Sequence, residues 1–217
     1  MLLSEHEIKY KDKKKYNIFL ILNILNEVNF FFEIICFNFE IINLLRAENN
    51  VSMSYFSISY TKKISSSNEE LWNLISSPEH LNLVHPFCKS NESIVWDRQN
   101  SKDILVYLNG MVYFRDFIEW SEGVGYTLMI GRKRGKKSKV IWKIFNKGNS
   151  LFLKITVFPY LLNNWPMVLK ILPYFLIISP ILKNYLSSVV GGINWYLINK
   201  KPVKKNHFGK HIWFSKY

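Results

Sequence analysis

Apolar and polar residues alternate with a period of two from Tyr55 onward, which is typical of a strand that buries one face. Further segments of this kind lie near 93–97, 103–108, 111–120, 124–130, 138–146 and 150–158. Asn109-Gly110 is a signal for a two-residue hairpin loop, because this pair tolerates the positive φ angles of a type I′ turn. The pattern predicts a sheet of about seven strands, mostly antiparallel.

Several of these segments are apolar on both faces. In 138–146, Val140, Trp142 and Ile144 face one way, while Ile141 and Phe145 face the other. A sheet that is covered on one side and lines an enclosed space on the other needs apolar side chains on both faces. The pattern therefore favours a cavity over an ordinary packed core.

Two short helices are predicted after the first strand. Ser67 and Glu70 have the spacing of a capping box, and the helix that they open includes Trp72. Ser77-Pro78-Glu79 then has the composition of an N-cap and first turn, which predicts a second helix through Leu81 and Val84.

The last predicted element is a long helix that begins at Ser179-Pro180. Gly191-Gly192 lies inside it, and each glycine costs about 1 kcal/mol relative to alanine. Close approach of the helix backbone to the sheet would explain this pair; the alternative is that the helix ends there and restarts. The apolar face recurs at three-to-four spacing and comprises Ile181, Leu182, Tyr185, Leu186, Val189, Ile193, Tyr196 and Leu197.

The first 52 residues follow neither pattern. Residues 18–45 are largely apolar, but Glu27, Glu33 and Glu40 interrupt them, and a carboxylate near a bilayer centre costs about 3 kcal/mol. No small-residue cleavage site of a signal peptide follows. We therefore interpret residues 1–52 as an N-terminal extension, either poorly ordered or the result of a mis-assigned start, and place the domain at residues 53–217.

Charge separates the two parts further. Residues 1–52 carry six basic and seven acidic side chains, whereas residues 53–217 carry 23 basic and nine acidic ones, a net charge of +14. Such a surface attracts lipid headgroups, nucleic acid or an acidic partner, although many of the lysines can serve solubility alone. The two cysteines, Cys36 and Cys88, are too few for a disulfide framework, so we expect a cytoplasmic protein.

Two segments are candidates for contact with a membrane surface. A basic hairpin tip would grip phosphates, and its lack of aromatic residues disfavours nucleic acid; a solvated turn is the alternative. Residues 165–178 are apolar but broken by Pro166 and Pro173, which favours a portal flap or an interfacial segment over a membrane span. The basic tip comprises Arg132, Lys133, Arg134, Lys136 and Lys137.

Catalytic and metal-binding signals are weak. His85 and Cys88 have ligand chemistry, but structural metal sites need about four ligands, so we expect neither a metal nor another cofactor. Asp116 shares a face with Phe114, whereas Arg115 lies on the other. An acid among apolar neighbours is either a cavity base or the partner of a nearby cation. Asp116 and His85 thus remain the only catalytic candidates, and the question of enzyme activity stays open.

The order of elements and two sequence runs resemble the START/polyketide-cyclase (SRPBCC) superfamily over residues 53–217. The runs are WNLISSP at Trp72–Pro78 and, between Tyr185 and Ser215, YLSSVVGGINWYL followed by KPVKKNHFGKHIWFS. The resemblance implies an α+β helix-grip fold, with an antiparallel sheet wrapped around the long helix and a cavity for lipids, sterols, polyketides or other apolar molecules. These runs are architectural, so they indicate fold more than function.

Three functions follow as hypotheses. The first is binding or transport of an apolar small molecule or lipid, the second a cyclase or hydrolase acting in the same cavity, and the third a peripheral membrane protein that handles lipids. Neither the ligand nor the oligomeric state can be read from these residues. We expect the cavity to be lined by Ile181, Tyr185 and Val189 from the helix and by Tyr107, Phe114 and Trp142 from the sheet.

Overall fold

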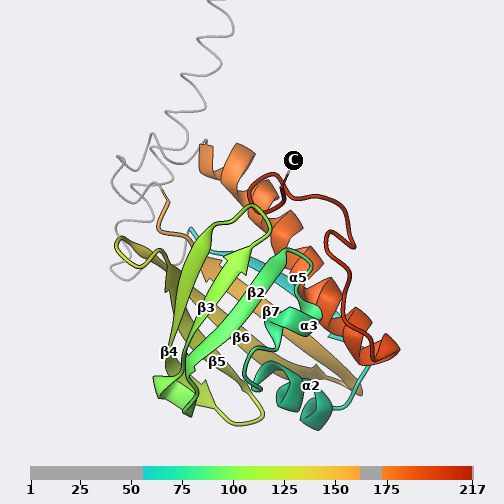
Figure 1. The fold of residues 1–217 in the computed structure, drawn as a ribbon. Coiled ribbons are helices and arrows are strands. Elements are labelled where there is room, and N and C mark those ends of the chain that lie inside the picture. Colours follow the sequence, from blue (N-terminus) through green and yellow to red (C-terminus); the bar gives the residue numbers. More distant parts are fainter. Residues whose placement is uncertain (1–55, 162–172, 217) are drawn as a thin grey trace, which may run out of the picture. The chain divides into compact units, whose positions relative to one another are not determined.

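Seven antiparallel strands form one curved sheet in the order β1-β7-β6-β5-β4-β3-β2, as seen in a computed structural model that describes residues 56–161 and 173–216. The sheet wraps around the long helix α5 (Ser179–Asn199), as Figure 1 shows. This is the α+β helix-grip architecture that the sequence predicts. The strands are β1 (Ile58–Ile64), β2 (Cys88–Val95), β3 (Lys102–Tyr107), β4 (Val112–Ser121), β5 (Gly125–Gly131), β6 (Lys137–Lys147) and β7 (Ser150–Phe158).

Strand β2 begins five residues earlier than the segment predicted at 93–97, and Cys88 is its first residue rather than part of a loop. The run from Lys89 to Ser93 is polar, so hydrophobic alternation gives no signal there. Side-chain hydrogen bonds hold it instead: the amide group of Asn82 bonds both the N–H and the C=O of Asn91, each at 2.8 Å. The 3₁₀ turn η1 (Arg98–Asn100) then leads into β3.

The two short helices are present as α2 (Asn68–Ile75) and α3 (Leu81–Val84). The capping interaction at the start of α2 is confirmed, since the backbone N–H of Glu70 donates to Ser67 Oγ at 3.1 Å. The predicted cap at Ser77 is wrong. Ser77 Oγ instead donates to the carbonyl of Leu74 at the end of α2, and Glu79 has a φ of 58°, which breaks the chain direction before α3.

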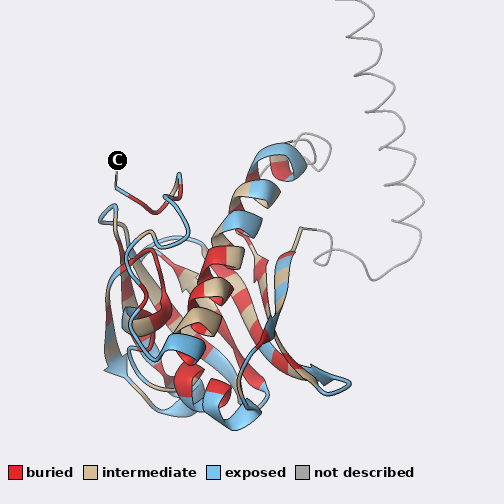
Figure 2. Cartoon of the chain, turned by 90° about the vertical axis from the view of Figure 1, so that its right-hand side faces the viewer, coloured by how far each residue is buried: buried red, intermediate tan, exposed pale blue. Residues whose placement is uncertain are grey.

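Helix α5 runs unbroken through Gly191-Gly192, so the alternative of two separate helices is wrong. A π-helical turn, η2 (Tyr174–Ile178), leads directly into it, and Ser179 is therefore not its N-cap. The side of α5 that packs on the sheet is buried, as Figure 2 shows. By length and composition, the helical stretch Tyr174–Asn199 is the one candidate membrane span among the described residues, but close to half of its most apolar part is buried inside the domain.

The glycine pair allows close packing, but against α3 rather than against the sheet. A Cβ atom at Gly192 would lie 2.1 Å from the carbonyl oxygen of Val84, inside van der Waals contact. A Cβ atom at Gly191 would meet only the ring of Phe208, at 3.3 Å. Gly192 therefore sets the distance between α5 and the end of α3, where His85 follows.

Part of the prediction falls outside the described residues. The proposed boundary at Met53 and residues 165–172 of the predicted flap both lie there, so they stay predictions. The end of that flap is described, and in η2 the side chains of Phe175, Leu176 and Ile177 are 54–67% exposed.

Candidate functional site

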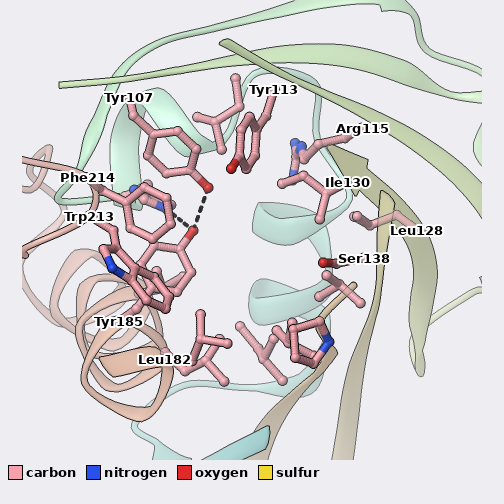
Figure 3. A pocket seen from close by; sticks show the side chains of 18 of the residues that line it. Tyr107, Tyr113, Arg115, Leu128, Ile130, Ser138, Leu182, Tyr185, Trp213 and Phe214 are labelled. Atoms are coloured by element: carbon pink, nitrogen blue, oxygen red, sulfur yellow. Dashed lines mark hydrogen bonds between the residues drawn. The ribbon is translucent and has the colours of Figure 1, made fainter. Parts of the chain in front are cut away.

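A cavity of about 130 Å³ lies between the concave face of the sheet and α5 (Figure 3). Strands β3 to β7 supply one wall through every second side chain, for example Leu128 and Ile130 of β5. Helix α5 supplies the other wall through Leu182, Tyr185, Leu186 and Val189. An engineered protein cavity of roughly 150 Å³ holds a benzene molecule, so this space suits a compact molecule of about one ring.

Four of the six residues expected in the wall lie there: Tyr107, Trp142, Tyr185 and Val189. Phe114 does not, because the inward residues of β4 are its neighbours Tyr113 and Arg115. Ile181 does not line the cavity either. Consecutive residues of an α-helix point about 100° apart, and it is the next residue, Leu182, that faces the space.

Asp116 lies on the same outer face of β4 as Phe114. Its carboxylate forms an ion pair with Lys137 of β6, and both side chains are a little under one third exposed. The structure thus shows the cation-paired alternative rather than a base inside the cavity. Of the five residues of the predicted basic tip, Lys137 forms this ion pair. The other four are exposed at the β5–β6 turn: Arg132, Lys133, Arg134 and Lys136.

The other catalytic candidate, His85, does reach the cavity. Its Nδ1 accepts a hydrogen bond from the backbone N–H of Phe87 at 3.1 Å, and its Nε2 lies 2.9 Å from Tyr185 Oη. Tyr185 Oη lies in turn 3.0 Å from Tyr107 Oη, so three side chains from a loop, α5 and β3 are joined. Burial lowers the pKa of His85 to about 3, with Arg115 contributing, so the imidazole is neutral near pH 7.

Arg115 is a wall residue that the sequence analysis assigned to the wrong face. Its guanidinium contacts both carboxylate oxygens of Asp103, with Nε 2.7 Å from Oδ1, and both side chains are fully buried. Asp103 more than offsets the effect of burial, so the pKa of Arg115 is raised. The sequence analysis missed the length of the loop between β3 and β4. The pairing of these strands is centred on Asn109, with Gly110 at a φ of 88°, and this register sets Asp103 opposite Arg115.

The C-terminal segment after α5 closes part of the cavity, which hydrophobic periodicity alone does not predict. Trp213 and Phe214 line the space, and the ring of Phe214 stacks on Tyr107 with centroids 4.2 Å apart. Several hydrogen bonds fix the segment, among them one from Asn109 Nδ2 to the carbonyl of Trp213 at 2.7 Å and one between His211 Nε2 and the carbonyl of Ile181 at 3.1 Å.

No group of three or more His, Cys, Asp or Glu side chains within the described ranges is placed to hold a metal ion. Cys88 is buried and free, and burial raises the pKa of its thiol to about 11. Such a thiol is protonated near pH 7 and is a poor nucleophile and a poor metal ligand.

Comparison with known proteins agrees with the fold. No family model and no curated protein matches the sequence. Among solved structures, DynU16, a protein in the dynemicin biosynthetic locus, is 12% identical to this chain, with a TM-score of 0.52. The match covers 67% of this chain and 48% of DynU16, so the chain spans about half of DynU16. An uncharacterised protein from Bacillus thuringiensis is 13% identical, with a TM-score of 0.51 over 66% of this chain and 99% of its own.

A START superfamily protein from Mycobacterium smegmatis is 15% identical, with a TM-score of 0.51 over 67% of this chain and 99% of its own. At these identities the similarity concerns the fold. The chain therefore has a helix-grip fold of the START/SRPBCC type, as the order of its elements predicts.

Proposed function

We propose that this domain binds a small apolar molecule in the cavity between the sheet and α5. The observation that carries the proposal is a partly open cavity of about 130 Å³ whose wall is mostly aliphatic and aromatic. Apolar surface transferred from water into such a space contributes about 25 cal/mol per Å². The shared fold of a START superfamily protein supports a ligand-binding role without identifying the ligand.

The size of the cavity favours a compact ligand over a lipid chain. A space close to that of a benzene-binding cavity accommodates one ring with a short substituent, whereas a long acyl chain needs several times more room. We therefore narrow the expected ligand from lipids in general to molecules of about seven to nine non-hydrogen atoms, a count that follows from roughly one ring plus a small group.

Binding is favoured over catalysis by the chemistry of the wall. The described residues that line the cavity include no carboxylate, cysteine or lysine. His85 is the one imidazole among them, and both of its nitrogens are engaged, by the N–H of Phe87 and by Tyr185. A general base needs a free lone pair within reach of its substrate, and His85 offers none.

Calorimetric titration with toluene tests the proposal directly. We expect one site per chain with a sub-millimolar Kd, about −5 kcal/mol, and a change in the fluorescence of the wall residues Trp142 and Trp213. Absence of heat and of a fluorescence change up to the solubility limit of toluene would contradict the proposal.

A second function, contact with an anionic membrane surface, is supported by a separate observation. Phe175, Leu176 and Ile177 follow one another in η2, and each is more than half exposed. Consecutive exposed apolar side chains are costly in water and suit the interfacial layer of a bilayer, to which the +14 charge of residues 53–217 adds attraction. This would place a cytoplasmic protein transiently at a membrane.

A further inference from the structure

The hydrogen bonds that join His85, Tyr185 and Tyr107 leave one hydroxyl proton unused. The backbone N–H of Phe87 donates to His85 Nδ1, so that nitrogen carries no proton. The buried imidazole is neutral and has a single proton, which must therefore sit on Nε2. His85 Nε2–H then donates to Tyr185 Oη.

The bond between Tyr185 and Tyr107 can run in either direction. Tyr185 Oη accepts from His85 and lies 3.0 Å from Tyr107 Oη, and either phenol can donate to the other. Burial raises the pKa of both phenols, so each keeps its proton near pH 7. Whichever phenol donates to the other, the O–H of the second remains to be donated elsewhere.

No acceptor for that last proton appears among the hydrogen bonds of the described residues. Tyr107 lines the cavity, and Figure 3 shows its hydroxyl pointing toward the open space rather than into the wall. The neighbouring hydroxyls have other partners: that of Tyr113 interacts with Tyr160, and Ser138 Oγ accepts from the backbone N–H of Tyr160. Tyr185 lines the cavity as well, so the Tyr107–Tyr185 pair presents one hydrogen-bond donor to whatever fills it.

We propose that the cavity is selective for a compact, uncharged molecule that carries an acceptor oxygen, such as a small ketone or aldehyde, held by the free O–H of the Tyr107–Tyr185 pair. The inference rests on the proposed ligand-binding function and adds the chemistry of the ligand. Asp103 neutralises Arg115, the one cation in the described wall, so the site does not require an anionic ligand.

Two probes of the same shape isolate the hydrogen bond. Cyclohexanone and methylenecyclohexane differ only in C=O against C=CH₂, and calorimetry gives the ratio of their affinities for each protein. In the double variant Tyr107→Phe with Tyr185→Phe, which removes both phenol protons, the ratio of ketone to hydrocarbon affinity should fall about tenfold from its wild-type value, the effect of one hydrogen bond. Tyr126→Phe is the matched control: Tyr126 is also a buried tyrosine of the sheet, but its hydroxyl has no partner among the described residues, and Tyr126 does not line the cavity.

The outcomes separate the two proposals. If methylenecyclohexane binds but the double variant leaves the ratio unchanged, the role of the tyrosine pair is wrong and the apolar cavity stands. If neither probe binds the wild type, the binding function itself is wrong. Benzoate binding more tightly than benzaldehyde would overturn the preference for an uncharged ligand.

An infrared measurement keeps the test valid if the double variant does not fold. The carbonyl stretching band of cyclohexanone bound to the wild type should lie at lower frequency than that of the same ketone in hexane, because a phenol donor weakens the C=O bond. A folded double variant should return the band to the hexane position. A band at the hexane position in the wild type would show that no donor reaches the ligand.

Discussion

Arg115 and Asp103 are directly opposed across β3 and β4, and the guanidinium holds both carboxylate oxygens where neither side chain is more than 2% exposed. Arg115, but not Asp103, lines the mostly apolar cavity. An isolated charge there would be strongly disfavoured, so each member is tolerated because the other is present.

Removing one member of this pair should therefore cost more than removing both. Asp103→Leu or Arg115→Met alone should lower the free energy of unfolding by about 3–5 kcal/mol, since each leaves an unpaired buried charge. The double variant should recover most of that loss. Urea unfolding followed by circular dichroism measures all three, and simple additivity of the two single losses would show that the ion pair is not the cause.

Adjacent glycines of α5 should respond in opposite directions to the same substitution. Gly192→Ala places a methyl group 2.1 Å from the Val84 carbonyl oxygen and should lower the free energy of unfolding by about 1–3 kcal/mol, despite the gain in helix propensity. In Gly191→Ala the methyl group meets only the movable ring of Phe208, so the result should range from neutral to about 1 kcal/mol more stable. Melting temperatures of the two variants provide the test, and equal effects would refute the role assigned to Gly192.

Two buried histidines should make the domain sensitive to acid. Burial lowers the pKa of His80 and of His85 from 6.5 to about 3. Below pH 6.5 the two histidines are protonated in the unfolded chain but stay neutral in the folded state. The free energy of unfolding therefore decreases as the pH falls toward 3. Between pH 7 and pH 5 each histidine should account for a loss of about 2 kcal/mol.

Urea unfolding at several pH values measures this dependence. His85→Gln keeps polar atoms near Tyr185 but cannot be protonated, so its stability should fall less steeply between pH 7 and pH 5 than that of the wild type. The control is His207→Gln, which changes an exposed histidine and should retain the wild-type slope. Equal slopes for all three proteins would contradict the assignment.

The fold was accessible from the sequence because its signals are local. Period-two alternation, the capping box at Ser67 and the apolar face of α5 each depend on neighbours within a few residues, and together they predict the element order. The first five residues of β2 were missed because Asn82, which holds them, precedes the strand in the chain and acts through its side chain rather than through a hydrophobic pattern.

The site was only partly accessible, because it depends on which face of a strand turns inward. Strand β4 has large side chains on both faces, so its sequence cannot distinguish Phe114 and Asp116 from Tyr113 and Arg115. The register of β4 on β3 decides which face of β4 turns inward. That register follows from a three-residue loop around Asn109, instead of the two-residue loop that Asn109-Gly110 suggests. Trp213 and Phe214 enter the wall through tertiary packing of a segment without regular structure.

Membrane contact through the basic β5–β6 turn predicts salt-dependent binding to vesicles. Lys133→Gln with Arg134→Gln should weaken binding to phosphatidylserine vesicles at low salt by about 2 kcal/mol, roughly 30-fold, at about 1 kcal/mol per charge. Lys143→Gln with Lys147→Gln removes the same charge toward the opposite end of β6 and should have a smaller effect. Sedimentation with phosphatidylserine and with phosphatidylcholine vesicles measures both pairs, and equal binding to the two lipids by the wild type would exclude the membrane role.

Filling the cavity should abolish binding without unfolding the domain. Val189 is 2% exposed and lines the space opposite the sheet, so in Val189→Trp the indole should occupy the volume that the ligand needs. Overpacking costs about 1–3 kcal/mol in a filled core, but here the existing space should reduce that cost. Calorimetry with toluene should detect binding to the wild type and none to Val189→Trp.

Ile198→Trp provides the matched control for that variant, because Ile198 is on the same helix but is 56% exposed. It should bind toluene as the wild type does and melt at a similar temperature. If Val189→Trp binds toluene as tightly as Ile198→Trp, the ligand site lies elsewhere. If Val189→Trp unfolds while Ile198→Trp does not, the space beside Val189 is too small for an indole and α5 rests there on a closely packed core.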